Sequence, residues 1–549
     1  MNDEGYGGNE SAEGKGSFDV LVVGAGFSGM YALYELRQRG FTVAVVEAGS
    51  DVGGTWYWNR YPGARCDVES MQYSYSFSPE LEQDWKWNER YATQPEILRY
   101  ANHVAHRFDL KRNIHFNVRV RSASFDEECN LWTVTTDTGE QILSRYCIMA
   151  TGCLSLPREP NIRGLSFFEG ARYHTAQWPR EGVDFTGMRV GVIGTGSTGI
   201  QAIPQIAKQA KHLYVFQRTA NYSVPARNRP LDENEVAEFK SRYREHRQRM
   251  RTSGSGTLWT QENKSALDIL DGEREEIFEA NWNRGGPGLV QVFPDLGRDL
   301  KANETLAKFV RTKICQAVSD PVTADALSPK DHPIGTKRIC VDIEYFETYN
   351  RQNVTLIDLK SEPVEQITPD GVETSAASYK LDCLVFATGF DAITGALQAI
   401  DIRGREGNSL REKWAGGPRT YLGLATAGFP NLFMVTGPGS PSVLSNMFVS
   451  IEQHVEWIAD CLTYLRKNEM DFIDANSDFE DRWVSHVNDL AEQTLFSHAK
   501  SWYLGANVPG KPRVFMPYVG GVGAYREKCE QVARDNYEGF TTTVAVKRR

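Results

Sequence analysis

The sequence predicts an α/β protein with two Rossmann-like dinucleotide-binding domains, the second of which carries a helical insertion. Two GxGxxG loops, at residues 24–29 and 194–199, are the main observation behind this prediction. Each loop follows a β-branched apolar run, typical of a buried parallel strand, and opens a segment of helical character. Glycines in such a loop let the backbone approach a pyrophosphate, and the helix N-terminus favours its charge.

The composition excludes several classes of protein. A chain of 549 residues is long enough for more than one domain, and its net charge of −10 argues against nucleic acid as a partner. No apolar run approaches the ~18 residues of a membrane helix, so we expect no membrane contact. The nine cysteines include no C-x-x-C pair, which argues against a disulfide reductase and indicates reduced thiols in the cytoplasm. We expect no metal site, and a monomer or weak oligomer.

The first glycine loop lies among all the elements of a nucleotide site, in the expected order. A strand at 18–23, a helix from about 28 to 38 and a strand at 41–46 lead to an acid whose carboxylate can accept the ribose hydroxyls. A chance glycine-rich turn explains this order poorly. The residues expected to contact the nucleotide are Gly24, Gly26, Ser28, Gly29 and Glu47.

The second loop lacks that acid. After a strand at 188–193, a helix to about residue 210 that Pro204 is expected to kink, and a strand at 213–216, Gln217 occupies the position of the ribose carboxylate. Arg218 and Thr219 follow, and a guanidinium suits a 2′-phosphate, which a carboxylate would repel. We therefore expect NADPH rather than NADH. The loop residues expected to contact it are Gly194, Thr195, Gly196, Ser197, Thr198, Gly199 and Ile200.

Two further segments carry a resemblance to a known family. Residues 53–67 follow the pattern Gly-Gly-x-Trp-x4-Tyr-Pro-Gly-x3-Asp, and residues 168–179 the pattern Phe-x-Gly-x-x-x-His-x-x-x-Trp-Pro. The chain resembles the type I Baeyer–Villiger monooxygenases in both, and is most similar to the phenylacetone and steroid monooxygenase group. That family carries FAD and NADPH and inserts one atom of O2 beside a ketone carbonyl. The resemblance implies FAD in the first site and NADPH in the second.

The resemblance also implies roles for single residues. Arg338 is the cation that keeps a C4a-peroxyflavin deprotonated and stabilises the tetrahedral adduct with the ketone, Asp67 orients it, and Lys337 binds the 2′-phosphate. Without the resemblance, Lys337 and Arg338 would be interpreted as surface residues, and each aromatic of residues 56–58 as core packing. The further cofactor contacts that the family implies are Thr55, Trp56, Tyr57, Trp58, Arg65, Tyr73, Val120, Asp391, Met447 and Trp502.

The linker and the insertion complete the predicted domain order. His174 and Trp178 lie four residues apart, so a helical turn would place them on one face; we favour a structural or conformational role for His174 over acid–base work. The insertion is rich in charged residues, and we expect solvated charged faces there. The predicted parts are a disordered tail (1–16), an FAD domain (17–152 and 386–549), a linker with an NADP domain (153–229 and 336–385) and a helical insertion (230–335).

The C-terminal part is expected to complete the ketone pocket. A Pro/Gly-rich loop at 437–447 opens an amphipathic helix that runs to about residue 467. Trp502 lies on a segment with hinge glycines that in the family folds over NADP. Plain core packing explains Leu444 and Met447 as well as a pocket does. The pocket candidates are Cys153, Ser442, Val443, Leu444 and Met447.

The predicted function is an NADPH- and O2-dependent flavoprotein monooxygenase that converts ketones to esters or lactones, with sulfide oxidation as a possible side activity. The nearest alternative is a heteroatom-oxidising flavin monooxygenase, which would share both glycine loops but neither the 168–179 pattern nor the Asp67–Arg338 pair. A second alternative is a non-catalytic redox sensor, against which the presence of every catalytic position argues. The sequence identifies no particular ketone.

Overall fold

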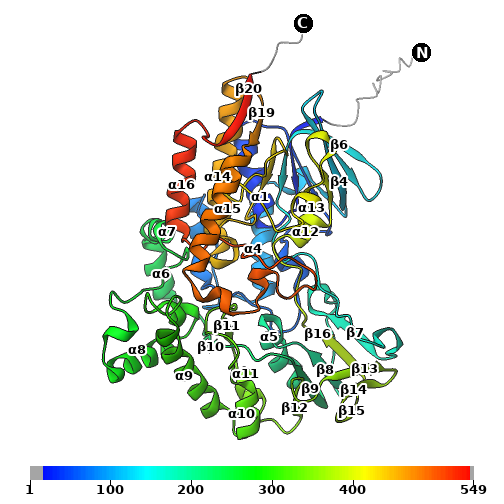
Figure 1. Cartoon of the computed structure of the whole chain (residues 1–549), viewed down its shortest axis with the longest axis vertical. Coiled ribbons are helices and arrows are strands. Elements are labelled where there is room, and N and C mark those ends of the chain that lie inside the picture. The colour runs from blue at the N-terminus through cyan, green and yellow to red at the C-terminus, as the bar shows by residue number, and fades with distance from the viewer. Residues whose placement is uncertain (1–16, 545–549) are drawn as a thin grey trace, which may run out of the picture.

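The computed structural model describes residues 17–544, in which the two largest sheets occupy opposite halves of an elongated molecule (Figure 1). Residues 1–16 and 545–549, and with them the expected N-terminal tail, lie outside the described residues. Within 17–544, no helix is both long and apolar enough to cross a membrane. The two-sheet architecture agrees with the predicted fold class.

The first sheet has eight strands in the order β17-β4-β5-β6-β1-β2-β3, with β18 also paired to β6. The strand β1 is buried over residues 20–23, where both faces of this apolar run are covered. Helix α1 (Phe27–Gln38) starts within the first glycine loop and packs on α14 (Met447–Lys467). The strands are β1 (Ser17–Val23), β2 (Val43–Glu47), β3 (Ile114–Phe116), β4 (Val120–Asp126), β5 (Leu131–Thr136), β6 (Gln141–Met149), β17 (Asp401–Arg403) and β18 (Leu432–Met434).

The second sheet is wholly parallel, in the order β12-β9-β8-β16-β7. Its glycine loop follows β8 and opens α5 (Ser197–Ala207), which contains Pro204. The strands are β7 (Ala171–His174), β8 (Arg189–Ile193), β9 (His212–Gln217), β12 (Val354–Asp358) and β16 (Cys383–Phe386).

The linker does not form the helical turn expected for His174 and Trp178. Residues 171–174 instead pair with β16 as the edge strand β7, and a short 3-10 turn (Thr175–Gln177) separates His174 from Trp178. The prediction of a shared helical face is wrong because the backbone of this segment completes the sheet. The linker is therefore built into the second sheet.

In the sequence, the insertion lies between two short strands that pair with each other, β10 (Ser223–Pro225) and β11 (Cys340–Asp342). Its apolar side chains Phe278, Leu306 and Val310 join the core beneath the second sheet. Its helices are α6 (Glu233–Ser241), α7 (Tyr243–Thr252), α8 (Asp271–Arg284), α9 (Leu300–Ala317) and α10 (Pro321–Leu327).

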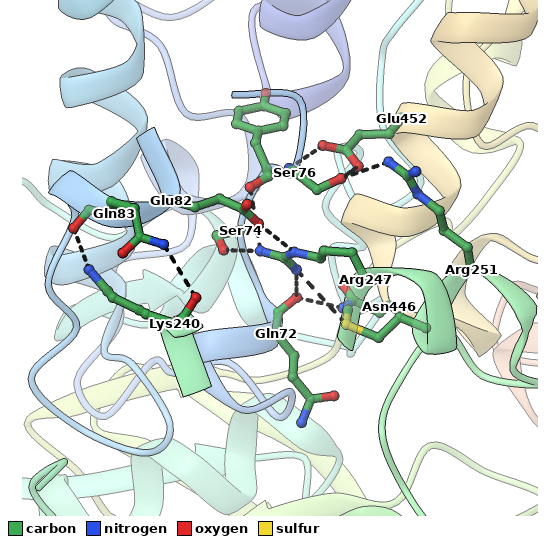
Figure 2. Close-up of polar contacts among 12 residues, drawn as sticks. Gln72, Ser74, Ser76, Glu82, Gln83, Lys240, Arg247, Arg251, Asn446 and Glu452 are labelled. Atoms are coloured by element: carbon green, nitrogen blue, oxygen red, sulfur yellow. Dashed lines mark hydrogen bonds and ion pairs between the residues drawn. The ribbon is translucent and has the colours of Figure 1, made fainter. Parts of the chain in front are cut away.

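One part of the insertion reaches the other half of the molecule. Helix α7 packs on α16 (Val522–Arg534) and presents Arg247, only 6% exposed, to the segment 72–82 (Figure 2). His246 is also buried. The expectation of solvated charged faces holds for Arg244, Glu245 and Arg249 of α7, which are exposed, and is wrong for Arg247, an ion-paired arginine in the interface.

After β16 the chain returns to the first sheet through β17 and β18, and α14 then starts and ends where the sequence predicts. The remaining helices are α2 (Thr55–Trp58), α3 (Pro79–Asp84), α4 (Gln94–Arg107), α11 (Tyr345–Thr348), α12 (Gly395–Gln398), α13 (Leu410–Lys413) and α15 (Ser477–Glu492). Among them, α11 packs on α5 and α9 in the half of the second sheet, and α4 packs on α2 beside the first glycine loop. The remaining strands are β13 (Val364–Thr368), β14 (Gly371–Thr374), β15 (Ser378–Lys380), β19 (Met470–Ala475) and β20 (Phe540–Val544).

Candidate functional site

In the first glycine loop, the positions of Gly24 and Gly29 leave no room for a side chain. A Cβ added to Gly29 would lie 1.8 Å from the carbonyl oxygen of Gly24, which has a φ of +105°. The carboxylate of Glu47, only 5% exposed, accepts N–H groups from Ala25 (2.7 Å) and Gly49 (2.6 Å). The loop and its acid therefore form one rigid unit, which suits close approach of a dinucleotide.

Residues 53–67 lie directly on this loop. A Cβ on Gly54 would come within 2.8 Å of the Cα atom of Gly26. Trp56 is buried and its indole N–H donates to the Tyr73 hydroxyl (3.1 Å), and Tyr57 is buried as well. Thr55 and Trp58 are exposed beside them. The start of this segment and Tyr73 are thus gathered beside the first loop.

The second glycine loop has the same construction with one open position. A Cβ on Gly199 would meet the carbonyl oxygen of Gly194 at 2.2 Å, whereas one on Gly196 would meet no atom within 4 Å. The Thr195 hydroxyl donates to the carbonyl of Thr219 (3.0 Å). Ser197, the first residue of α5, is exposed at the helix N-terminus. This end of the helix is suited to an anion.

Arg218 and Lys337 lie close enough for their charges to repel each other, and the Asp331 carboxylate acts on Lys337 without a salt bridge. Within the described residues, neither Arg218 nor Lys337 has a hydrogen bond or ion pair. Burial lowers the pKa of Lys337; Asp331 opposes this, while Arg218 and Lys360 lower it further. The side chain of Gln217 turns inward and donates to the carbonyl of Ala326 (2.8 Å). The cations are thus free to meet a phosphate.

Arg338 and Asp67 form a two-pronged ion pair between the halves of the molecule. The Nε and Nη2 atoms of Arg338 donate to the Asp67 carboxylate at 2.9 and 2.7 Å, and Nη1 donates to the carbonyl of Val443 at 2.6 Å. The side chains are 30% and 21% exposed. Burial opposes the charge of Arg338, but Asp67, together with Tyr503 and Cys340, holds the pKa of Arg338 well above its usual value.

An apolar cluster lies next to this pair. Five predicted residues belong to it: Cys153, Val443, Leu444, Met447 and Trp502. Burial raises the pKa of the Cys153 thiol to about 11, so the thiol is protonated at neutral pH. Ser442 has a φ of +42°, a conformation that non-glycine residues adopt at a cost. The predicted pocket residues are therefore brought together, with a strained residue at their edge.

Other predicted residues have structural contacts that the sequence did not indicate. Arg65 pairs with Glu89 (2.7 Å), and its carbonyl accepts from Gln201 of α5 (3.0 Å), so it joins the two nucleotide units. Asp391 pairs with Lys511 of the Trp502 segment. The side chain of Val120 is packed in the core of the first sheet, and that of Ile200 in the core of the second sheet.

His174 holds the linker against the end of β16. Its Nε2 atom lies 3.2 Å from both the carbonyl of Arg158 and the hydroxyl of Thr388, and its Nδ1 atom accepts from the amide of Ala176 (3.1 Å). Burial lowers its pKa. These contacts support the structural role that we favour.

Sequence reasoning missed several residues around the pair. Tyr503 lies beside the guanidinium of Arg338, which partly offsets the burial that raises the pKa of this phenol to about 12. Phe515 and Met516 belong to the same apolar cluster. The position of Tyr503 next to Trp502 was the one available signal. Gln72 belongs to no motif, and Asn446 lies in the 437–447 loop without a predicted role; both are described below.

The described residues 17–544 include no group of three or more His, Cys, Asp or Glu side chains able to hold a metal ion. All nine cysteines are free thiols.

Known proteins of similar sequence and structure identify the family of this chain. A family model described as pyridine nucleotide-disulphide oxidoreductase matches residues 21–265. The chain is 43% identical over 524 residues to a Baeyer-Villiger monooxygenase of Pseudooceanicola batsensis, with 95% of each chain covered. It is similar to the structure of oxidized steroid monooxygenase bound to NADP (TM-score 0.93, 52% identity, 96% and 100% covered) and to the OTEMO complex with FAD and NADP (TM-score 0.93, 41%, 96% and 99%). The chain belongs to the family of FAD- and NADP-dependent Baeyer–Villiger monooxygenases.

Proposed function

We propose that this protein uses NADPH and O2 to convert ketones to esters or lactones, and that Arg338 stabilises the negative charge that develops at the reacting atoms. The Asp67–Arg338 pair beside the apolar cluster is the observation that carries the proposal. FAD, when bound at the first glycine loop, supplies the redox chemistry that activates O2. The free thiols favour a cytoplasmic enzyme, and we expect a monomer or weak oligomer.

Arg338 is suited to this role by its remaining donors and its permanent charge. Asp67 and the Val443 carbonyl use only some of its N–H groups, so others can donate to a carbonyl oxygen that gains negative charge. Its guanidinium stays protonated at any working pH, which a lysine in a partly dry site does not guarantee. Asp67 fixes the direction of the cation, and the apolar side chains around it exclude water.

The two glycine loops would hold the cofactors. Glu47 would accept the ribose hydroxyls of FAD, and Gly196 leaves room for the pyrophosphate of NADPH. Arg218 and Lys337 would bind the 2′-phosphate. Trp502, on a segment tied back through Lys511 to Asp391, would cover the nicotinamide end.

Arg338→Ala tests the assignment. Reduction of the flavin by NADPH under anaerobic conditions should stay within about threefold of wild type, and ester formation should fall at least ~100-fold because charge stabilisation is lost. Arg338→Lys should recover a minor part of the activity, since it restores charge without the planar fork. Ester formation by Arg338→Ala at the wild-type rate would contradict the role.

A ketone panel tests the reaction itself. Purified holoenzyme with NADPH should add one oxygen atom to at least one member of a set of arylacetones, cyclic ketones, long-chain ketones and 20-ketosteroids, as seen by mass spectrometry. Sulfides and tertiary amines in parallel test the heteroatom-oxidising alternative. Product from these alone would favour that alternative, and peroxide release without any product would favour a redox sensor.

A further inference from the structure

Asn446 lies where three parts of the chain meet. They are residues 67–82 (called the flavin-side segment), the insertion, and helix α14 (called the pocket helix). Asn446 is 1% exposed and precedes the first residue of α14. Its side-chain amide donates to the carbonyl of Gln72 (2.8 Å), its backbone N–H donates to the carbonyl of Ser255 (2.8 Å), and its side-chain oxygen accepts the N–H of Phe448 (3.2 Å). The side chain thus caps a helix and joins it to the Gln72 segment, while the backbone N–H of the same residue joins it to the insertion.

Gln72 is the partner that makes this junction specific. It is 2% exposed, and its carbonyl also accepts from Nη1 of Arg247 at 3.2 Å, so two donors from different segments converge on it (Figure 2). Its side chain accepts the N–H of Leu258 (2.9 Å) and donates to Glu69 (2.9 Å). Gln72 stands five residues after Asp67, in the same flavin-side segment.

Arg247 anchors the insertion to this segment. It pairs with Glu82 at 2.7 Å, with both side chains less than a tenth exposed, and donates to the hydroxyl of Ser74 at 2.8 Å (Figure 2). A buried ion pair with extra hydrogen bonds fixes one arrangement, because any displacement leaves a charge unpaired. The Gln72 carbonyl is therefore a fixed acceptor.

The pocket loop, residues 442–446, runs from Asn446 to the carbonyl that holds Arg338. Val443 accepts from Arg338, and the hydroxyl of Ser445 donates to the carbonyl of Ser442 (2.8 Å). The φ of +42° at Ser442 persists only if the surroundings fix the loop. The bond from Asn446 to Gln72 supplies such a restraint at the far end of the loop.

We propose that Asn446 is a positioning residue: by donating to the Gln72 carbonyl, it holds the pocket loop against Arg338 and so sets the placement of the ketone. This inference rests on the proposed ketone oxygenation. It separates the two functions of one side chain, since the accepting oxygen caps the helix and the donating nitrogen positions the loop.

Asn446→Asp tests the separation. A carboxylate still accepts the N–H of Phe448 and suits a helix N-terminus, but it has no donor for the Gln72 carbonyl. Hydrogen exchange of the holoenzyme should rise about fivefold or more in the amides of 439–446 and stay unchanged in the body of α14. The value of kcat/KM for the ketone should fall about 5- to 20-fold.

Two further arms protect this result. Protonation gives the introduced carboxyl group a donor, so the ratio of variant to wild-type kcat/KM should improve between about pH 8 and about pH 5.5. Asn446→Ser, an uncharged cap whose hydroxyl is too short to reach Gln72, should reproduce the exchange increase without the pH effect. It also serves as the test if the first variant does not fold.

Asn476→Asp is the matched control. Asn476 also caps a helix, α15, through its side-chain oxygen (2.9 Å to the N–H of Asp478) and has no bond to the pocket. The proposal is overturned if exchange in 439–446 is unchanged in Asn446→Asp, or if the control raises it equally. Should wild type oxygenate no ketone, the proposed function fails, while the exchange arm still decides the role of Asn446.

Discussion

The Asp67 carboxylate holds the Arg338 guanidinium through parallel bonds of 2.7 and 2.9 Å that join residues 271 positions apart in the chain. The pairing fixes the plane of the guanidinium as well as its place. Because Asp67 belongs to the segment on the first glycine loop and Arg338 follows the insertion, the pair is also a direct link between the halves. Any movement of one half against the other therefore acts on the cation.

Asp67→Asn should weaken both the link and the chemistry. The NH2 group of the asparagine would face one of the N–H donors of Arg338, so one of the two hydrogen bonds is lost. The guanidinium is also left without its counter-charge. We expect about 2 kcal/mol of destabilisation, below the value for a fully buried pair because the side chains are 30% and 21% exposed. Thermal unfolding of the holoenzyme and the ratio of ester to hydrogen peroxide per NADPH measure the two effects. An unchanged ratio of ester to hydrogen peroxide would show that Asp67 does not orient the cation.

Arg218→Ala should discriminate between the nicotinamide cofactors. We expect the KM for NADPH to rise about 10- to 100-fold and that for NADH less than about threefold, since only NADPH carries the phosphate that a guanidinium recognises. Lys337→Ala should act in the same direction. The double variant should lose less than the sum of both in free energy, because the two cations share one anion. Equal effects on the two cofactors would remove the phosphate-binding role.

Gly196→Ala and Gly199→Ala should separate cofactor binding from folding. A methyl group at Gly196 meets no protein atom, so the fold should be unchanged, but it would occupy the space expected for the pyrophosphate and raise the KM for NADPH at least ~10-fold. A methyl group at Gly199 lies 2.2 Å from a carbonyl oxygen and should lower the melting temperature or abolish folding. Normal NADPH kinetics in Gly196→Ala would place the pyrophosphate elsewhere.

Sequence reasoning succeeded where a local pattern has a backbone cause. The strand before each glycine loop, the loop itself and the following helix are set by residues within about 30 positions of one another. The Asp67–Arg338 pair was available from the resemblance alone, since no spacing rule connects such distant residues. The start of α14 followed from its Pro/Gly-rich loop and its apolar periodicity.

The failures have a common cause in tertiary contacts. The linker strand β7 is half-buried without alternation, so nothing in residues 171–174 distinguishes it from a turn until β16 is beside it. The buried Arg247 looks like any arginine on a charged helix, and only Glu82, from the other half, makes it an interface residue. Asn446 and Gln72 meet for the same reason.

His454 should make the fold sensitive to acid. It is 0% exposed, its Nδ1 atom accepts the N–H of Thr436 (2.9 Å), and burial lowers its pKa from 6.5 to about 3, with Arg526 acting in the same direction. Below pH 6.5 this imidazole is therefore protonated in the unfolded chain but stays neutral in the folded state. Stability from this group is complete above pH 6.5 and is lost progressively as the pH falls from there toward about 3.

The variant His454→Asn isolates this contribution. An asparagine oxygen can take the place of Nδ1 as acceptor, while no group remains to be protonated, at the cost of a small cavity. We expect the melting temperature of wild type to fall more between pH 7.5 and pH 5.5 than that of the variant, since the lost linkage amounts to at most about 1.4 kcal/mol per pH unit. His115→Asn, at an exposed position on β3, should keep the wild-type slope. Parallel curves for wild type and His454→Asn would mean that this imidazole does not set the acid limit.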